Sequence, residues 1–209
     1  MIKHLISPFL IIMVLFPTLI FETKAQDFKD EFIARMKSSN DQINSIASDF
    51  VQERSLSIME DVLVSSGEFF YKKPGLMKWD QQQPSKYYFI LNGDKVIRFD
   101  GKKRKVVPAN SPQVAHFKEF IIGAVSGSIF ENKLYNTEIN KVGNRAMVVL
   151  IPQQKAMSKR IKKIHLEFDY EKMILLNLIL FETDGDKTAI RFTNQKINTI
   201  TDLTIFNQE

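Results

Sequence analysis

Short apolar runs separated by turn-forming residues recur along most of this 209-residue chain. Asn92-Gly93 and Asp184-Gly185 supply the positive φ angles that tight hairpin turns need, and Lys73-Pro74-Gly75 marks a further turn. Strands that follow one another through such turns pair as an antiparallel meander. The expected strands are residues 46–54, 61–72, 76–80, 86–92, 95–100, 104–107, 134–140, 145–151, 161–169, 174–182 and 188–197.

Two segments have a helical spacing of apolar residues instead. The first follows a candidate cap at Asp27 and carries Phe28, Phe32, Ile33 and Met36. The second follows Ser111-Pro112, which suits the start of a helix, and its apolar face carries Val114, Phe117, Phe120 and Ile121. The pattern therefore predicts an α+β fold that is mainly antiparallel β.

The first 25 residues are predicted to be a secretory signal peptide, because Lys3 precedes a long apolar run and a small-residue cleavage pattern ends at Ala25. A membrane anchor is the alternative. Pro8 and Pro17 interrupt the run, which falls short of the roughly 20 uninterrupted apolar residues of a spanning helix. We expect cleavage near Ala25, export of the chain, and one domain of residues 26–209.

The chain contains no cysteine, which excludes disulfides, thiolate metal sites, a thiol nucleophile and a lipid-modified cysteine. Its formal net charge of +5 becomes +4 without the signal peptide, since Lys3, Lys24 and Glu22 are removed. Two basic clusters, Lys102–Lys105 and Lys155–Lys163, lack the interleaved aromatic residues of nucleic-acid sites. Solvated turns are one interpretation, and contact with anionic headgroups or an acidic partner is the other.

No catalytic motif is present: we find no nucleophile elbow, phosphate loop, dinucleotide fingerprint or zincin motif. His116 and His165 are predicted to face solvent. Asp184 and Asp186 flank a hairpin glycine and lack the rest of a calcium loop. We therefore predict no enzyme, no cofactor and no metal site, and a hydrolase ranks last among the alternatives.

Several strands are apolar on both faces, although a sheet with one solvated face should alternate. Residues 161–169 alternate, whereas 87–91, 146–151 and 175–181 do not. A packed core with a few exposed apolar residues is one interpretation. The other is a concave apolar face that is too large for the helices to fill, which predicts a lipid-binding site.

Residues 65–84 (SSGEFFYKKPGLMKWDQQQP) and 89–100 (FILNGDKVIRFD) closely resemble the outer-membrane lipoprotein carrier family, LolA, and residues 45–52 (SIASDFVQ) resemble its first strand. The resemblance implies an incomplete, open β-barrel with helices covering the concave face. It also implies a cavity for lipoprotein acyl chains and passage across the periplasm from an inner-membrane ATP-driven release complex to an outer-membrane acceptor. We expect the protein to be a monomer and to be located in the periplasm.

By position, Met77 and Trp79 match the family's cavity aromatic and its tryptophan, and Lys73 matches an arginine that latches the sheet to the lid. Lysine for arginine is a departure, because an ammonium does not reproduce the planar fork of donors. The predicted cavity residues are Phe50, Met77, Trp79, Ile97, Phe99, Ile190 and Phe192. The predicted lid residues are Val114, Phe117, Phe120 and Ile121.

A binding module that senses lipids or lipoproteins, or an accessory of an exporter, is the alternative function on the same sheet. An outer-membrane barrel agrees less well with the sequence, because a helix interrupts the strands in mid-chain.

Overall fold

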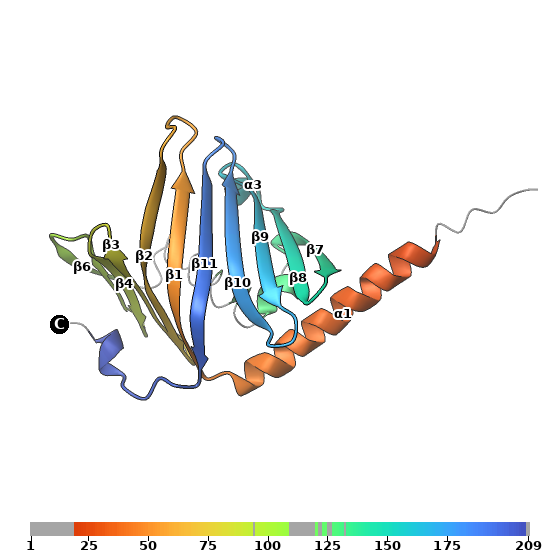
Figure 1. Ribbon diagram of the computed structural model, residues 1–209, viewed down its shortest axis with the longest axis horizontal. Helices are drawn as coiled ribbons and strands as arrows, with labels where there is room; N and C mark the ends of the chain where they lie inside the picture. The colour runs from red at the N-terminus through yellow and green to blue at the C-terminus, as the bar shows by residue number, and fades with distance from the viewer. Residues whose placement is uncertain are drawn as a thin grey trace, which may run out of the picture.

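The computed structural model describes residues 19–93, 95–108, 120, 123–124, 127–131 and 133–207, with side chains from Asp27 onward. One 11-stranded sheet runs in the order β6-β5-β4-β3-β2-β1-β11-β10-β9-β8-β7 (Figure 1). Its strands are β1 (Ser45–Ser55), β2 (Val62–Lys72), β3 (Leu76–Gln83), β4 (Tyr87–Asn92), β5 (Lys95–Phe99), β6 (Arg104–Pro108), β7 (Tyr135–Val142), β8 (Arg145–Pro152), β9 (Ile161–Asp169), β10 (Ile174–Glu182) and β11 (Lys187–Ile197).

Every predicted strand is present, and the predicted turns lie between them. Gly93 and Gly185 have φ angles of 57° and 97°, as the tight hairpins require. The strand pairs are antiparallel throughout. Because β6 and β7 lie at opposite edges and do not pair, the sheet curves without closing. The predicted mainly antiparallel, open-barrel fold class is confirmed.

The longest helix, α1 (Leu19–Gln42), contains the predicted apolar segment but extends beyond it at both ends. Asp27 therefore lies inside α1 and does not cap it. The short helices are η1 (Ser128–Glu131), α3 (Lys155–Ser158) and η2 (Thr204–Phe206). Among the helices that the structure describes, none is long and apolar enough to cross a membrane. In the predicted lid helix, Phe120 is described and half-buried, whereas Val114, Phe117 and Ile121 lie outside the described residues.

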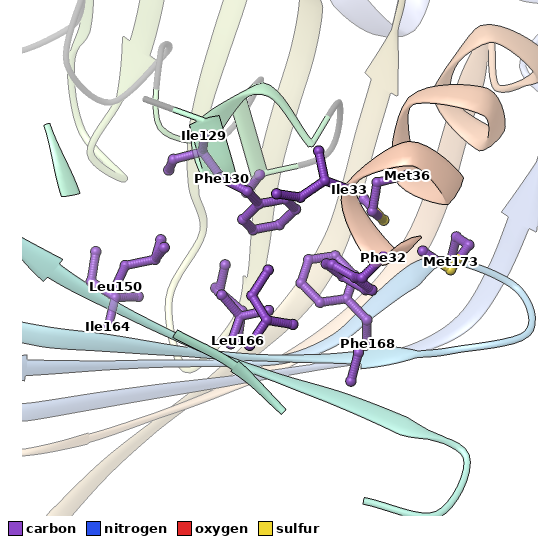
Figure 2. Packing of buried hydrophobic residues seen from close by; sticks show 14 of the residues in the cluster. Phe32, Ile33, Met36, Ile129, Phe130, Leu150, Ile164, Leu166, Phe168 and Met173 are labelled. Carbon is purple, nitrogen blue, oxygen red and sulfur yellow. The ribbon is translucent and has the colours of Figure 1, made fainter. Parts of the chain in front are cut away.

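Strands β7 to β10 form what we call the covered half of the sheet, since α1 and η1 pack on its concave face (Figure 2). Phe32 of α1 is fully buried, and its ring centroid lies 5.5 Å from those of Phe130 and Phe168. Ile33 and Met36 are buried beside it. The helical spacing of these residues places them on the face of α1 that meets the sheet.

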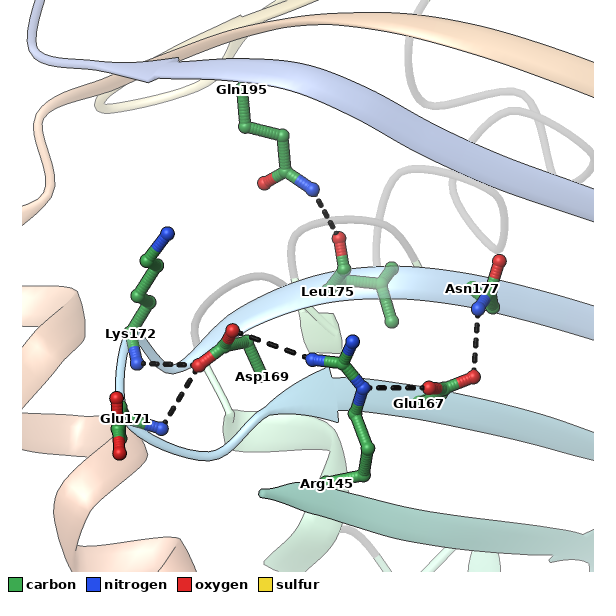
Figure 3. Close-up of polar contacts among 8 residues, drawn as sticks. All are labelled: Arg145, Glu167, Asp169, Glu171, Lys172, Leu175, Asn177 and Gln195. Atoms are coloured by element: carbon green, nitrogen blue, oxygen red, sulfur yellow. Dashed lines mark hydrogen bonds and ion pairs between the residues drawn. The ribbon is translucent and has the colours of Figure 1, made fainter. Parts of the chain in front are cut away.

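The opposite, convex face of the covered half is polar near the end of β9 (Figure 3). Arg145 forms ion pairs of 3.1 Å with Glu167 and 3.4 Å with Asp169, and the amide of Asn177 donates to Glu167 at 2.7 Å. Alternation along β9 therefore separates these charges from Leu166 and Phe168, which are buried on the concave side.

Strands β1 to β6, together with β11, form what we call the open half. Its convex face is covered by the C-terminal segment, residues 198–207, which sequence patterning did not assign to the core. Phe206 and Ile90 are fully buried there, and Ile200 and Tyr88 are buried in the same cluster. This segment explains why β4 is apolar in both phases: one face belongs to this cluster, and the other faces the concave side.

Candidate lipid-binding site

A cavity of about 480 Å³ opens on the concave face, between the covered half and the open half. Its walls come from strands at both ends of the chain, because β1 pairs with β11. The lining is mainly apolar and includes Ile43, Ile46, Phe69, Trp79, Phe89, Val96, Val107, Ala124, Phe168, Met173, Ile174, Leu175, Leu178, Ile190 and Phe192.

Trp79 is the centre of an aromatic wall in this cavity. Its ring stacks on Phe50 with centroids 3.8 Å apart and an interplanar angle of 29°. Phe69 and Phe192 meet it edge-on at 6.2 Å and 6.5 Å. Such aromatic packing gives a wall of fixed shape with a large apolar area.

Three of the predicted cavity residues, Trp79, Ile190 and Phe192, line the cavity. Phe50 and Met77 are each 1% exposed and pack behind the wall, so they support it without facing the cavity. A ligand contact at these two positions stays a prediction.

Ile97 and Phe99 need a correction, because they lie on the convex face. Both pack against the cluster of the C-terminal segment, and Phe99 stacks on Tyr88 with centroids 5.1 Å apart. On β5 the cavity is lined instead by Val96 and Arg98. Since β5 has apolar residues in both phases, hydrophobicity alone did not fix which phase faces inward.

Strand register identifies the wall residues that the sequence reasoning missed. Phe69 and Phe89 lie directly opposite Trp79 on the strands to either side. Residues directly opposite one another share a face of the sheet. Once Trp79 is placed, counting across the turns at residues 73–75 and 84–86 would therefore have found both.

Three uncharged polar side chains of the lining, Ser48, Gln52 and Gln195, use their donors inside the protein. The Ser48 hydroxyl lies 2.9 Å from the carbonyl oxygens of Asp49 and Thr193. The amide of Gln195 donates to the carbonyl of Leu175 at 2.6 Å (Figure 3), and that of Gln52 donates to Ser65 at 3.4 Å. Internal bonding of these groups keeps the cavity suited to an apolar ligand.

Lys73, the predicted latch, joins the β2–β3 turn to the end of α1. Its ammonium donates to the carbonyl of Asn40, and its backbone N–H donates to the carbonyl of Asn44 at 2.9 Å. A cation is favoured at a helix C-terminus because the carbonyl dipoles point toward it. This contact links the sheet to α1, while a latch to the lid helix stays a prediction.

The model of the family described as "Outer membrane lipoprotein carrier protein LolA" matches residues 41–209. This chain belongs to the LolA family. Outer-membrane lipoprotein carrier proteins of Chromohalobacter salexigens and Methylococcus capsulatus are each 23% identical to it, over 176 and 173 residues. The matches cover 84% and 83% of this chain and 81% of each relative.

Solved structures share the fold at low identity. An uncharacterized conserved protein from Thermus thermophilus superposes with a TM-score of 0.53 at 8% identity, over 86% of this chain and 93% of that one. The Pseudomonas aeruginosa MucA/MucB complex gives 0.52 at 13% identity, over 87% of this chain but only 61% of that chain. LolA carriers are non-enzymatic periplasmic chaperones, so this chain is not an enzyme, as the sequence predicted.

Proposed function

We propose that this LolA-family protein carries lipoproteins by holding their acyl chains in the concave cavity. The observation that carries the proposal is the aromatic wall around Trp79. It gives this member of a family of lipoprotein carriers an apolar, open cavity. The established family and the geometry of the cavity support the same class of ligand.

The energetics require a cavity of this chemistry. One acyl chain of about 14 methylenes costs roughly 11 kcal/mol to hold in water, at about 0.8 kcal/mol per methylene. Surface ion pairs contribute at most about 1 kcal/mol each and do not offset this cost. Apolar side chains such as Trp79, Phe89 and Phe192 do.

An empty cavity also needs cover, because exposed apolar surface promotes aggregation. The proposed lid consists of Val114, Phe117, Phe120 and Ile121. Phe120 packs against the core of the covered half, and Ala124, four residues further along, lines the cavity. Loading then exchanges lid contacts for acyl contacts, and the two states need differ by only a few kcal/mol.

Val107 and Val106 offer a matched test of the cavity. They are neighbours on the edge strand β6, but Val107 lines the cavity and Val106 is 53% exposed opposite Ile97 on the other face. Val107→Asp should weaken capture of a synthetic acylated peptide about tenfold or more, since it places a charge beside the chain. Val106→Asp should not.

Equal capture by wild type, Val107→Asp and Val106→Asp would remove the cavity assignment. Circular dichroism of both variants is the control for folding. The peptide without its acyl chain should not bind to any of the three proteins.

The proposed route runs from an inner-membrane ATP-driven release complex to an outer-membrane acceptor, with the carrier as a monomer and residues 1–25 removed near Ala25. Mass spectrometry of the exported protein tests the cleavage site. Co-purification separates the carrier from a sensing module or exporter accessory: a carrier returns lipoprotein, and a sensor returns its signalling partner.

A further inference from the structure

Two cations face each other at the edge of the cavity. Arg98 on β5 and Lys105 on β6 are directly opposed in the sheet and both line the cavity. Opposed residues have Cβ atoms about 5 Å apart, and like charges in such a pair destabilise the sheet. Both side chains are exposed, so solvent and ligand can reach them. An anion bound between them would offset the repulsion.

These two cations continue a row of residues across the concave face. In register, Trp79 lies opposite Phe89, Phe89 opposite Arg98, and Arg98 opposite Lys105. Neighbouring strands are about 4.8 Å apart, so the row extends roughly 14 Å from Trp79 to Lys105. It changes along its length from aromatic to basic, which matches an amphiphile with an apolar tail and a charged end.

The described part of the chain supplies little negative charge at this end of the row. Among the described residues, neither Arg98 nor Lys105 takes part in an ion pair within 4.0 Å. The nearby Asp100 carboxylate accepts the backbone N–H groups of Lys103 at 2.8 Å and Lys102 at 3.1 Å. These hydrogen bonds, more than Lys105 and Arg98, lower the pKa of Asp100. Its carboxylate is thus held in the turn.

Tyr87 adds a hydrogen-bond donor to the same corner of the cavity. The Arg98 guanidinium carbon lies 5.8 Å from the Tyr87 ring centroid, and both residues line the cavity. Burial raises the pKa of Tyr87, against a smaller opposing effect of Arg98. The phenol therefore stays protonated at neutral pH and can donate to an anion.

We infer that the ligand of this cavity carries an anionic group beside its acyl chain, bound by Arg98 and Lys105 with the chain directed toward Phe89 and Trp79. The inference rests on the proposed function and specifies its ligand chemistry. A carboxylate or phosphate meets the requirement. It can belong to the headgroup of an anionic lipid or to an acidic residue next to the acylated residue of a lipoprotein.

Palmitate and hexadecanol test the charge preference, because they share a chain length and differ at the head. Quenching or enhancement of Trp79 fluorescence reports binding, since Trp79 is the single tryptophan. Wild type should bind palmitate roughly fivefold more tightly, with a smaller ratio at high salt. Arg98→Gln/Lys105→Gln should bring the ratio close to one.

The control variant is Lys102→Gln/Arg104→Gln, which removes the same charge from the same hairpin. Arg104 lies opposite Phe99 on the convex face, and Lys102 lies in the turn. This variant should keep the palmitate preference. A preference that is lost equally in both variants would show an effect of net charge alone and overturn the inference.

Equal affinities in wild type, or a preference that survives Arg98→Gln/Lys105→Gln, would also overturn the inference while leaving the proposed function intact. A wild-type protein that binds neither ligand would contradict the proposed function, and the inference with it. Two further pairs identify the source of the anion: phosphatidylglycerol against phosphatidylcholine, and an acylated peptide with Asp against one with Asn after the acylated residue. The anion comes from the class of ligand, lipid or peptide, whose difference in affinity within its pair is lost in Arg98→Gln/Lys105→Gln.

Discussion

The two halves of the sheet carry similar aromatic residues, but these residues have different roles. In the covered half, Phe32 and Phe168 pack against each other and against Phe130, so folding buries their aromatic surface. In the open half, Trp79 and Phe192 remain half-buried around a cavity. The comparison teaches that a surplus of apolar strand residues lines a binding cavity on the part of the sheet where α1 and η1 do not pack.

The largest contrast is expected between Phe32→Ala and Phe192→Ala. Phe32→Ala should lower the free energy of unfolding by about 3–5 kcal/mol, because it leaves a void in a closed core. Phe192→Ala removes a half-buried wall and should cost roughly 1–2 kcal/mol of stability while weakening acyl binding. Urea unfolding and acyl-probe binding measure the two effects.

Equal losses of stability in the two variants would break the comparison, since the halves would then be packed alike. Unchanged acyl binding by folded Phe192→Ala would contradict the role of Phe192 in the binding cavity.

The sequence predicted the strands and turns because each is a local signal, such as Gly185 at a tight turn. It predicted the concave wall only in part. In β5, Val96, Ile97 and Phe99 are apolar in both phases, so sidedness depended on which face the C-terminal segment covers. That contact joins residues more than 100 positions apart, as in the bond from the Asn92 amide to the Phe206 carbonyl. No local pattern contains it.

Lys73 and Lys72 allow a finer comparison between the two faces. Lys73 donates to the Asn40 carbonyl at the end of α1, and Lys72 donates to the Ile200 carbonyl on the convex face at 3.1 Å. Lys73→Leu and Lys72→Leu should each cost roughly 1 kcal/mol of stability without unfolding the sheet.

Only Lys73→Leu should slow the transfer of an acyl probe to acceptor vesicles, because α1 lies on the concave side. Stopped-flow transfer measures the rate. A normal rate in Lys73→Leu would make Lys73 a turn residue only, and an equal slowing in Lys72→Leu would point to stability as the cause.

The smallest expected effect concerns pH and the covered half. Burial, and then Lys163, lower the pKa of His165 in β9. In the unfolded chain the pKa of this histidine is about 6.5, so just below that pH the unfolded state binds more protons than the folded state. The stability that is present above pH 6.5 is therefore lost as the pH falls through the lower pKa of the folded state. His165→Gln should flatten this part of the unfolding profile. The free energy of unfolding is measured by denaturant titration at several pH values. The same pH dependence in His165→Gln and in wild type would contradict the assignment.

The most direct measurement of the central claim uses Trp79 as the only tryptophan in the chain. A fatty acid brominated along its chain quenches indole fluorescence on contact. If the open half holds acyl chains against the wall, titration should give saturable quenching of Trp79 that unbrominated palmitate displaces. Binding of the brominated ligand without quenching, shown by equilibrium dialysis, would place the chain elsewhere and contradict the account.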